Sequence, residues 1–142
     1  MPRLSVLMIR AALLYLGVGF LFGGLLLFNK GVPFAGSIWR LLPVHVELLI
    51  FGWMMQLIMG VAFWIAPRFS KTPRYGRVFL AELACVLLNL GTLLNAAGQW
   101  GGTLPLQLMG RVALLCAGFV FLFHLFPRIK PLSISSAESR LD

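Results

Sequence analysis

The 142-residue sequence has little charge, and almost none of it is acidic. Only 11% of its residues are charged and Asp and Glu together number 4, whereas 60% of the residues are hydrophobic. Soluble domains contain about a quarter charged and roughly half apolar residues, so this composition excludes a soluble enzyme and a nucleic-acid-binding domain. The mean hydropathy of +0.94 indicates instead a protein of the lipid bilayer.

Cysteine is also scarce. Cys85 and Cys116 both lie within apolar runs, where cysteine behaves as a small hydrophobic residue, so they predict neither a disulfide nor a metal-binding pair. Met54, Met55 and Met59 carry thioether groups, which are soft ligands that Cu(I) prefers. We interpret these methionines as adaptable core residues and do not expect copper.

Four apolar segments are long enough to cross a bilayer as helices, which takes roughly 20 residues for a hydrocarbon core of ~30 Å. They are residues 11–28, 44–66, 78–98 and 106–126. Their short connections predict antiparallel neighbours, so we expect an all-α, up-down four-helix transmembrane bundle within residues 1–127. Residues 128–142, rich in serine and charge, are expected to form a disordered tail.

The basic residues are unevenly distributed between the two ends of these spans. Of the 12 Lys and Arg residues, nine fall on the side of the termini (Arg3, Arg10, Arg68, Lys71, Arg74, Arg77, Arg128, Lys130 and Arg140) and three on the other side (Lys30, Arg40 and Arg111). The positive-inside rule then predicts a bacterial inner-membrane protein with both termini in the cytoplasm.

Polar residues at membrane depth gather at two levels. Near the periplasmic ends we expect an ion pair between Glu47 and Arg111, and near the cytoplasmic ends a hydrogen bond between Glu82 and His124. A proton-uptake route is the functional alternative for Glu82 and His124. Because His45 and His124 lie near opposite faces, roughly 20 Å apart at 1.5 Å rise per residue, they cannot ligate one heme within a single chain.

The helical face of His45 has small residues beneath it. On a regular α-helix, Gly52, Gln56 and Gly60 follow His45 along one face, and a glycine there would leave a flat slot of the shape that a porphyrin edge needs. Arg40 lies at the height where heme propionates would emerge, and a guanidinium suits a carboxylate. In the first span, the glycines at 19 and 23 form a small-xxx-small pair that lets helices approach closely.

The stretch from Arg40 to Trp53, which includes Pro43, His45 and Gly52, followed by Gly60 and the exit Ala66-Pro67-Arg68, resembles the second transmembrane helix of heme-copper oxidase subunit I. The resemblance is closest to C-family cytochrome oxidases and the nitric oxide reductase large subunit. It covers residues 40–69, and a four-span unit corresponds to about one third of that twelve-helix subunit.

This resemblance implies a heme b with His45 as the axial ligand to its metal. It further suggests Arg40 for a propionate, Gly52 and Gly60 for clearance, and Trp53 and Phe63 for packing. The family's copper-site histidines, its cross-linked tyrosine and its late helix with two heme-ligating histidines have no counterpart here, so oxygen reduction by this chain alone is not expected. A homo-oligomer, dimer or trimer, or a partner membrane subunit would supply the second ligand.

The leading hypothesis is therefore a membrane b-type heme protein that transfers electrons or binds a diatomic gas. One alternative is a non-catalytic interaction subunit of a larger respiratory or photosynthetic complex, with His45 as a polar interface residue. Another is a small transporter or channel, because the third span carries a partial polar stripe: Glu82, Asn89, Thr92, Asn95 and Gln99.

Overall fold

The structure, a computed structural model, describes residues 1–67 and 75–129, and these residues form helices and no strand. Helix α1 spans Arg3–Gly31, α4 spans Val78–Gly101 and α5 spans Leu104–Leu125, followed by the 3-10 turn η3 (Phe126–Arg128). With the segmented helix between Gly36 and Ile65, the described residues contain four helices that are long and apolar enough to cross a membrane. The all-α class is confirmed, and the four predicted spans each correspond to one of these helices.

The second span consists of four consecutive helical segments. A 3-10 turn, η1 (Gly36–Arg40), leads into α2 (Leu41–Glu47), then into a π-helical stretch, η2 (Leu48–Met55), and finally into α3 (Gln56–Ile65). The wider π-helical turns hold more residues per turn than α-helical turns do. Side chains after Met55 therefore point in other directions than a regular α-helix would give them, which matters for Gln56 below.

The first span begins earlier than residue 11, because its first turns pack into the protein. Ser5 and Met8 are both fully buried, and the Ser5 hydroxyl donates to the carbonyl oxygen of Gly60 in α3 at 2.6 Å. At the other end of α1, the side-chain Oδ1 atom of Asn29 accepts hydrogen bonds from the backbone N–H groups of Phe34 and Ala35 at 3.1 Å each, which fixes the turn into η1.

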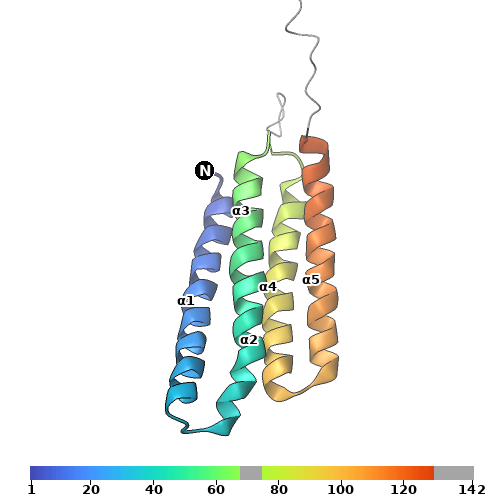
Figure 1. Cartoon of the computed structure of the whole chain (residues 1–142). Coiled ribbons are helices and arrows are strands. Elements are labelled where there is room, and N and C mark those ends of the chain that lie inside the picture. The colour runs from blue at the N-terminus through green and yellow to red at the C-terminus, as the bar shows by residue number, and fades with distance from the viewer. Residues whose placement is uncertain (68–74, 130–142) are drawn as a thin grey trace, which may run out of the picture.

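The helices run up and down in sequence order, with α1 and α5 at opposite edges of the molecule (Figure 1). Helix α1 packs along α2, η2 and α3, whereas α5 packs along α4, and the two pairs meet where α2 and η2 lie against α4. A square bundle would instead place the first and last helices side by side. We call the end with the α1–η1 and α4–α5 connections the loop end, and the end with the N-terminus and η3 the terminus end.

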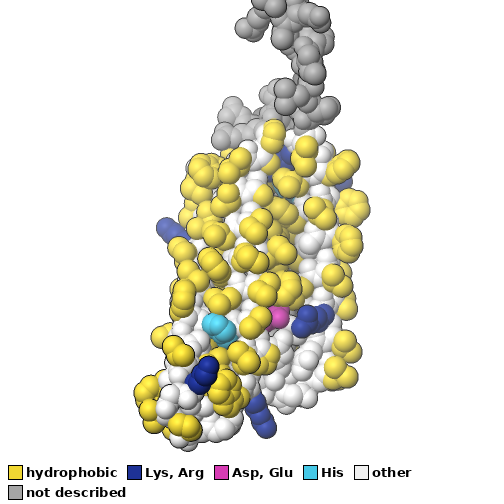
Figure 2. All heavy atoms as spheres, viewed as in Figure 1, with side chains coloured by type: hydrophobic (Ala, Val, Ile, Leu, Met, Phe, Trp, Pro, Cys, Tyr) yellow, Lys and Arg dark blue, Asp and Glu magenta, His cyan; other side chains and the backbone are white. Residues whose placement is uncertain are grey.

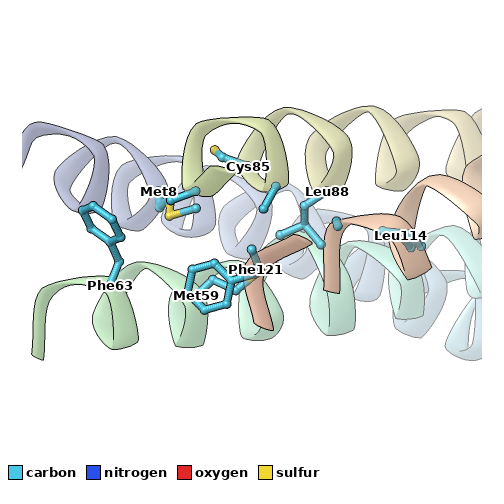
Figure 3. Close-up of a cluster of buried hydrophobic side chains, with 10 residues drawn as sticks. Met8, Met59, Phe63, Cys85, Leu88, Leu114 and Phe121 are labelled. Carbon is cyan, nitrogen blue, oxygen red and sulfur yellow. The ribbon is translucent and has the colours of Figure 1, made fainter. Parts of the chain in front are cut away.

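An apolar core joins the two helix pairs in the half of the molecule toward the terminus end. Met8 of α1, Met59 and Phe63 of α3, Leu88 of α4 and Phe121 of α5 are among its buried members, each at most 6% exposed (Figure 3). Outside this core, hydrophobic side chains cover most of the face shown in Figure 2, as expected of a surface that meets lipid.

Helices α4 and α5 come close enough for their backbones to touch. A Cβ atom at Gly110 would lie 2.6 Å from the backbone nitrogen of Asn95, and one at Gly91 would lie 2.9 Å from the carbonyl oxygen of Gly110. The short connection between these helices contains Gly102, whose φ of 68° is in the left-handed region that favours glycine.

Candidate functional site

His45 of α2 lies in a recess made by two glycines of α1. Its Nδ1 atom is 2.7 Å from the carbonyl oxygen of Gly19. A Cβ atom at Gly23 would come within 2.8 Å of the His45 Cε1 atom, so only glycine leaves room for the ring there. The small-xxx-small pair therefore does allow close helix packing, and one of the groups it accommodates is this histidine.

The hydrogen bond to Gly19 fixes the tautomer of the neutral His45 ring. A carbonyl oxygen only accepts, so Nδ1 carries the proton and donates it, and Nε2 keeps its lone pair. Ligating histidines commonly have this arrangement, in which a backbone carbonyl orients the ring through one nitrogen and the other binds the metal. The ring is half-buried. His45 is thus suited to binding one ligand on the outside of the α1–α2 contact.

The predicted flat slot over Gly52 and Gly60 is absent within the chain. Both glycines do face the same neighbour as His45, but α1 fills the space above them. A Cβ atom at Gly52 would lie 2.6 Å from Cγ of Tyr15, and one at Gly60 would lie 3.0 Å from Cβ of Met8. The clearance role of these glycines is wrong for a single chain, because they serve helix packing against α1.

Of the remaining predicted heme contacts, Phe63 lies in the apolar core. Arg40 is exposed at the end of η1, one helical segment before His45, and Trp53 is half-buried in η2. Phe63 lies at the terminus end, where its ring stacks on Tyr75 and His124 with centroid distances of 5.6 and 5.4 Å. Phe63 therefore belongs to the apolar core and not to the surroundings of His45.

The predicted ion pair between Glu47 and Arg111 is not formed. Glu47 is 4% exposed, and its Oε2 atom accepts a long hydrogen bond of 3.4 Å from the Gln99 amide. Arg111 lies exposed on α5 and lines an apolar groove beside Phe51 and Met55. Hydropathy gives the depth of each side chain in the membrane, but it does not say which neighbour that side chain meets.

The predicted hydrogen bond between Glu82 and His124 is also absent. His124 is buried, with Nδ1 3.1 Å from the carbonyl oxygen of Arg77 and Nε2 3.3 Å from Nη1 of Arg128. Glu82 is exposed on α4. The carbonyl oxygen of Arg77 and the guanidinium of Arg128 therefore take the place at His124 that we expected Glu82 to occupy.

Arg128, placed by sequence in the disordered tail, is an integral part of the fold. It is 1% exposed and donates to the carbonyl oxygens of Phe63, Ala66 and Pro67 at 3.1, 2.7 and 3.1 Å. These carbonyls include orphan acceptors at the end of α3, so Arg128 caps that helix. The expected tail from residue 130 onward lies outside the described residues. Arg128 follows His124 by four residues, and this spacing could have placed both residues on the same helical face.

The structure also shows a groove that sequence did not predict. It has a volume of about 770 Å³ and lies between α1, α2 and α4, with Val18, Val44 and Leu93 among its apolar walls. Tyr15 and Asn89 also line it, and the Tyr15 hydroxyl donates to the side-chain Oδ1 atom of Asn89 at 3.0 Å. His45 does not line this groove, so the groove offers no slot for a group bound to His45.

The methionines do not converge on one point, because Met54 and Met55 are exposed while Met59 is buried in the core. In residues 1–67 and 75–129, no three His, Cys, Asp or Glu side chains are grouped as metal ligands.

No family model matches this chain, and neither a curated protein nor a solved structure was found to be similar to it.

Proposed function

We propose that this protein is a membrane b-type heme protein with His45 as an axial ligand. The observation that carries the proposal is the orientation of the half-buried His45 ring, which donates from Nδ1 to Gly19 and leaves the Nε2 lone pair available. The resemblance of residues 40–69 to the second helix of heme-copper oxidase subunit I supports the same assignment. When bound, a heme would supply electron transfer or the binding of a diatomic gas.

The fit of the residues limits where such a heme lies. His45 suits axial ligation, and the exposed guanidinium of Arg40 is available to a propionate near the loop end. Gly52 and Gly60 do not fit, because Tyr15 and Met8 occupy the space above them. A heme at His45 would therefore lie outside the four helices, against a second protein surface.

That second surface is a further copy of the chain or a partner membrane subunit. In a twofold dimer, the two His45 rings would lie on either side of the axis and would together hold one heme. A trimer would hold one singly ligated heme at each His45. We also infer a bacterial inner-membrane location with the terminus end in the cytoplasm, on the distribution of the basic residues.

Absorption spectra of detergent-purified protein, oxidised and dithionite-reduced, test the proposal, with the pyridine hemochrome as the measure of heme content. We expect a reduced alpha band that is lost in His45→Gly and restored by added imidazole. A sharp band means a six-coordinate heme and a second ligand from another subunit. A broad band that shifts with carbon monoxide means an open site and favours gas binding.

Two results would overturn the heme proposal. The first is a colourless protein from cells supplied with heme during expression, which favours the interaction-subunit alternative. The second is an alpha band that survives in His45→Gly without imidazole, since His45 would then not be the ligand.

A further inference from the structure

Two side chains of the second span and two of α4 carry buried polar atoms that have no hydrogen-bond partner among the residues that the structure describes. They are Oε1 of Glu47, both amide atoms of Gln56, both amide atoms of Asn95, and Oε1 of Gln99. Gln56 and Asn95 are 0% exposed and Glu47 is 4% exposed. Buried polar groups are nearly always paired in native proteins, and an unpaired one is costly, so these atoms require a partner that the polypeptide does not provide.

The unpaired atoms lie on helices that touch one another. Glu47 bonds to Gln99 across the α2–α4 contact, and Asn95 lies four residues before Gln99, on the same face of α4. In a regular α-helix, the step from Glu47 to Gln56 would take about two and a half turns and place the two side chains on opposite faces. The intervening π-helical stretch takes fewer turns, and both side chains are buried.

The chemistry of these atoms indicates which partner they take. A cation would satisfy the four oxygens of Glu47, Gln56, Asn95 and Gln99 but would leave the amide nitrogens of Gln56 and Asn95 unpaired. Water both donates and accepts, and one buried water typically makes about three hydrogen bonds to groups such as these. A mixture of unpaired donors and acceptors therefore favours water.

The surroundings of the polar atoms define the two ends of a water path. Gln99 is half-buried near the end of α4, so it connects the buried atoms to the loop end. Beyond Gln56, toward the terminus end, the apolar core of Met59, Phe63, Leu88 and Phe121 follows. Water that enters beside Gln99 would thus meet a closed apolar barrier past Gln56.

We propose that the contact between α2, η2, α3 and α4 is a water-filled half-channel that opens at the loop end beside Gln99 and ends at Gln56. It brings bulk water to Glu47 and to the middle of the membrane without providing a passage across it. This inference does not depend on the proposed heme, because no residue of the half-channel is a proposed heme contact.

Cysteine accessibility tests the half-channel directly. In a Cys85→Ser, Cys116→Ala background, Gln56→Cys and the control Leu88→Cys each place one thiol at a buried position, since Leu88 is only 2% exposed in the core. Both proteins are reconstituted into liposomes without heme and treated with a small cationic methanethiosulfonate. Modification, measured by intact-protein mass, needs a thiolate and hence water. We expect Gln56→Cys to react at least about tenfold faster than Leu88→Cys. Equal rates at the two positions would overturn the proposal.

A second measurement applies where Gln56→Cys fails to fold. Gln56→Met is close in size and removes the amide. If water satisfies the amide, the substitution leaves that water with fewer partners, and we expect the thermal midpoint to fall by about 3 °C or more. If the amide has no partner, its removal relieves a buried unpaired group, and a higher midpoint would overturn the half-channel. The heme spectrum is recorded separately, so that the half-channel and the heme at His45 are tested independently.

Discussion

The two halves of the molecule satisfy their polar groups in different ways. At the terminus end, buried Arg128 and His124 reach backbone carbonyls and each other, and the apolar core fills the space between the helices. At the loop end, Glu47, Gln56 and Asn95 are equally buried but keep unpaired atoms, and a π-helical stretch interrupts the second span. Stability is therefore expected to come mainly from the terminus end, and ligand binding from the loop end.

This contrast explains why His45 is a better functional candidate than His124. Both rings bond to a backbone carbonyl through Nδ1, but His124 also uses Nε2, which accepts from Arg128. His45 keeps Nε2 available and is half-buried, whereas His124 is 3% exposed. The same side chain is thus structural in one half and available for binding in the other.

The largest expected effect is at the terminus end. Arg128→Met removes the donors that cap α3 and leaves the carbonyls of Phe63, Ala66 and Pro67 without them. Hydrogen bonds from a charged group contribute about 1.5–3 kcal/mol each, so we expect the free energy of unfolding to fall by about 3 kcal/mol or more. Unfolding in mixed detergent micelles measures it. Arg77→Gln, which changes an exposed arginine at the same end, is the control; comparable losses from both would mean that the cap contributes little.

The next effect concerns the α4–α5 contact in the loop half. Gly110→Ala would place a Cβ atom 2.6 Å from the backbone nitrogen of Asn95, so the helices must separate. Overpacking of this kind costs about 1–3 kcal/mol. Gly118→Ala on the same helix meets nothing within 4 Å and serves as the control. The thermal midpoints of the two variants give the comparison, and a Gly110→Ala midpoint at or above that of Gly118→Ala would contradict the close approach.

The sequence predicted the number, order and type of the helices, because hydropathy over some 20 residues decides membrane insertion in one dimension. It also singled out His45 and the Gly19/Gly23 pair. It did not predict that His45 and Gly23 touch, since contacts across helices depend on how each helix is rotated about its axis. The π-helical stretch, which was not predicted, changes that rotation along the second span.

A smaller effect on stability, but a decisive one on the ligand site, is expected at Gly23. In Gly23→Ala the new Cβ atom lies 2.8 Å from Cε1 of His45 and displaces the ring from its bond to Gly19. Alanine gains about 1 kcal/mol over glycine in a helix, which offsets much of the clash. We therefore expect a change in stability below about 1 kcal/mol, together with loss or broadening of the reduced alpha band.

The neighbouring residue provides the matched control for Gly23→Ala. A Cβ atom at Gly24 meets nothing within 4 Å, so Gly24→Ala should leave the spectrum unchanged and raise the thermal midpoint slightly. If the absorption spectrum of Gly23→Ala matches that of the unsubstituted protein, the recess in α1 does not position His45.

The smallest expected effects compare a fully buried hydrogen bond with a half-buried one. Ser5→Ala removes the bond to Gly60 at the terminus end, where the side chain is 0% exposed, and Tyr15→Phe removes the half-buried bond to Asn89 beside the groove. A typical hydrogen bond contributes about 1 kcal/mol, and the fully buried acceptor of Ser5 cannot be compensated by water. Ser5→Ala should therefore lower the free energy of unfolding more than Tyr15→Phe does, because the bond of Ser5 is fully buried and the bond of Tyr15 is only half-buried. The opposite order, measured in the same micelles, would contradict this dependence on burial.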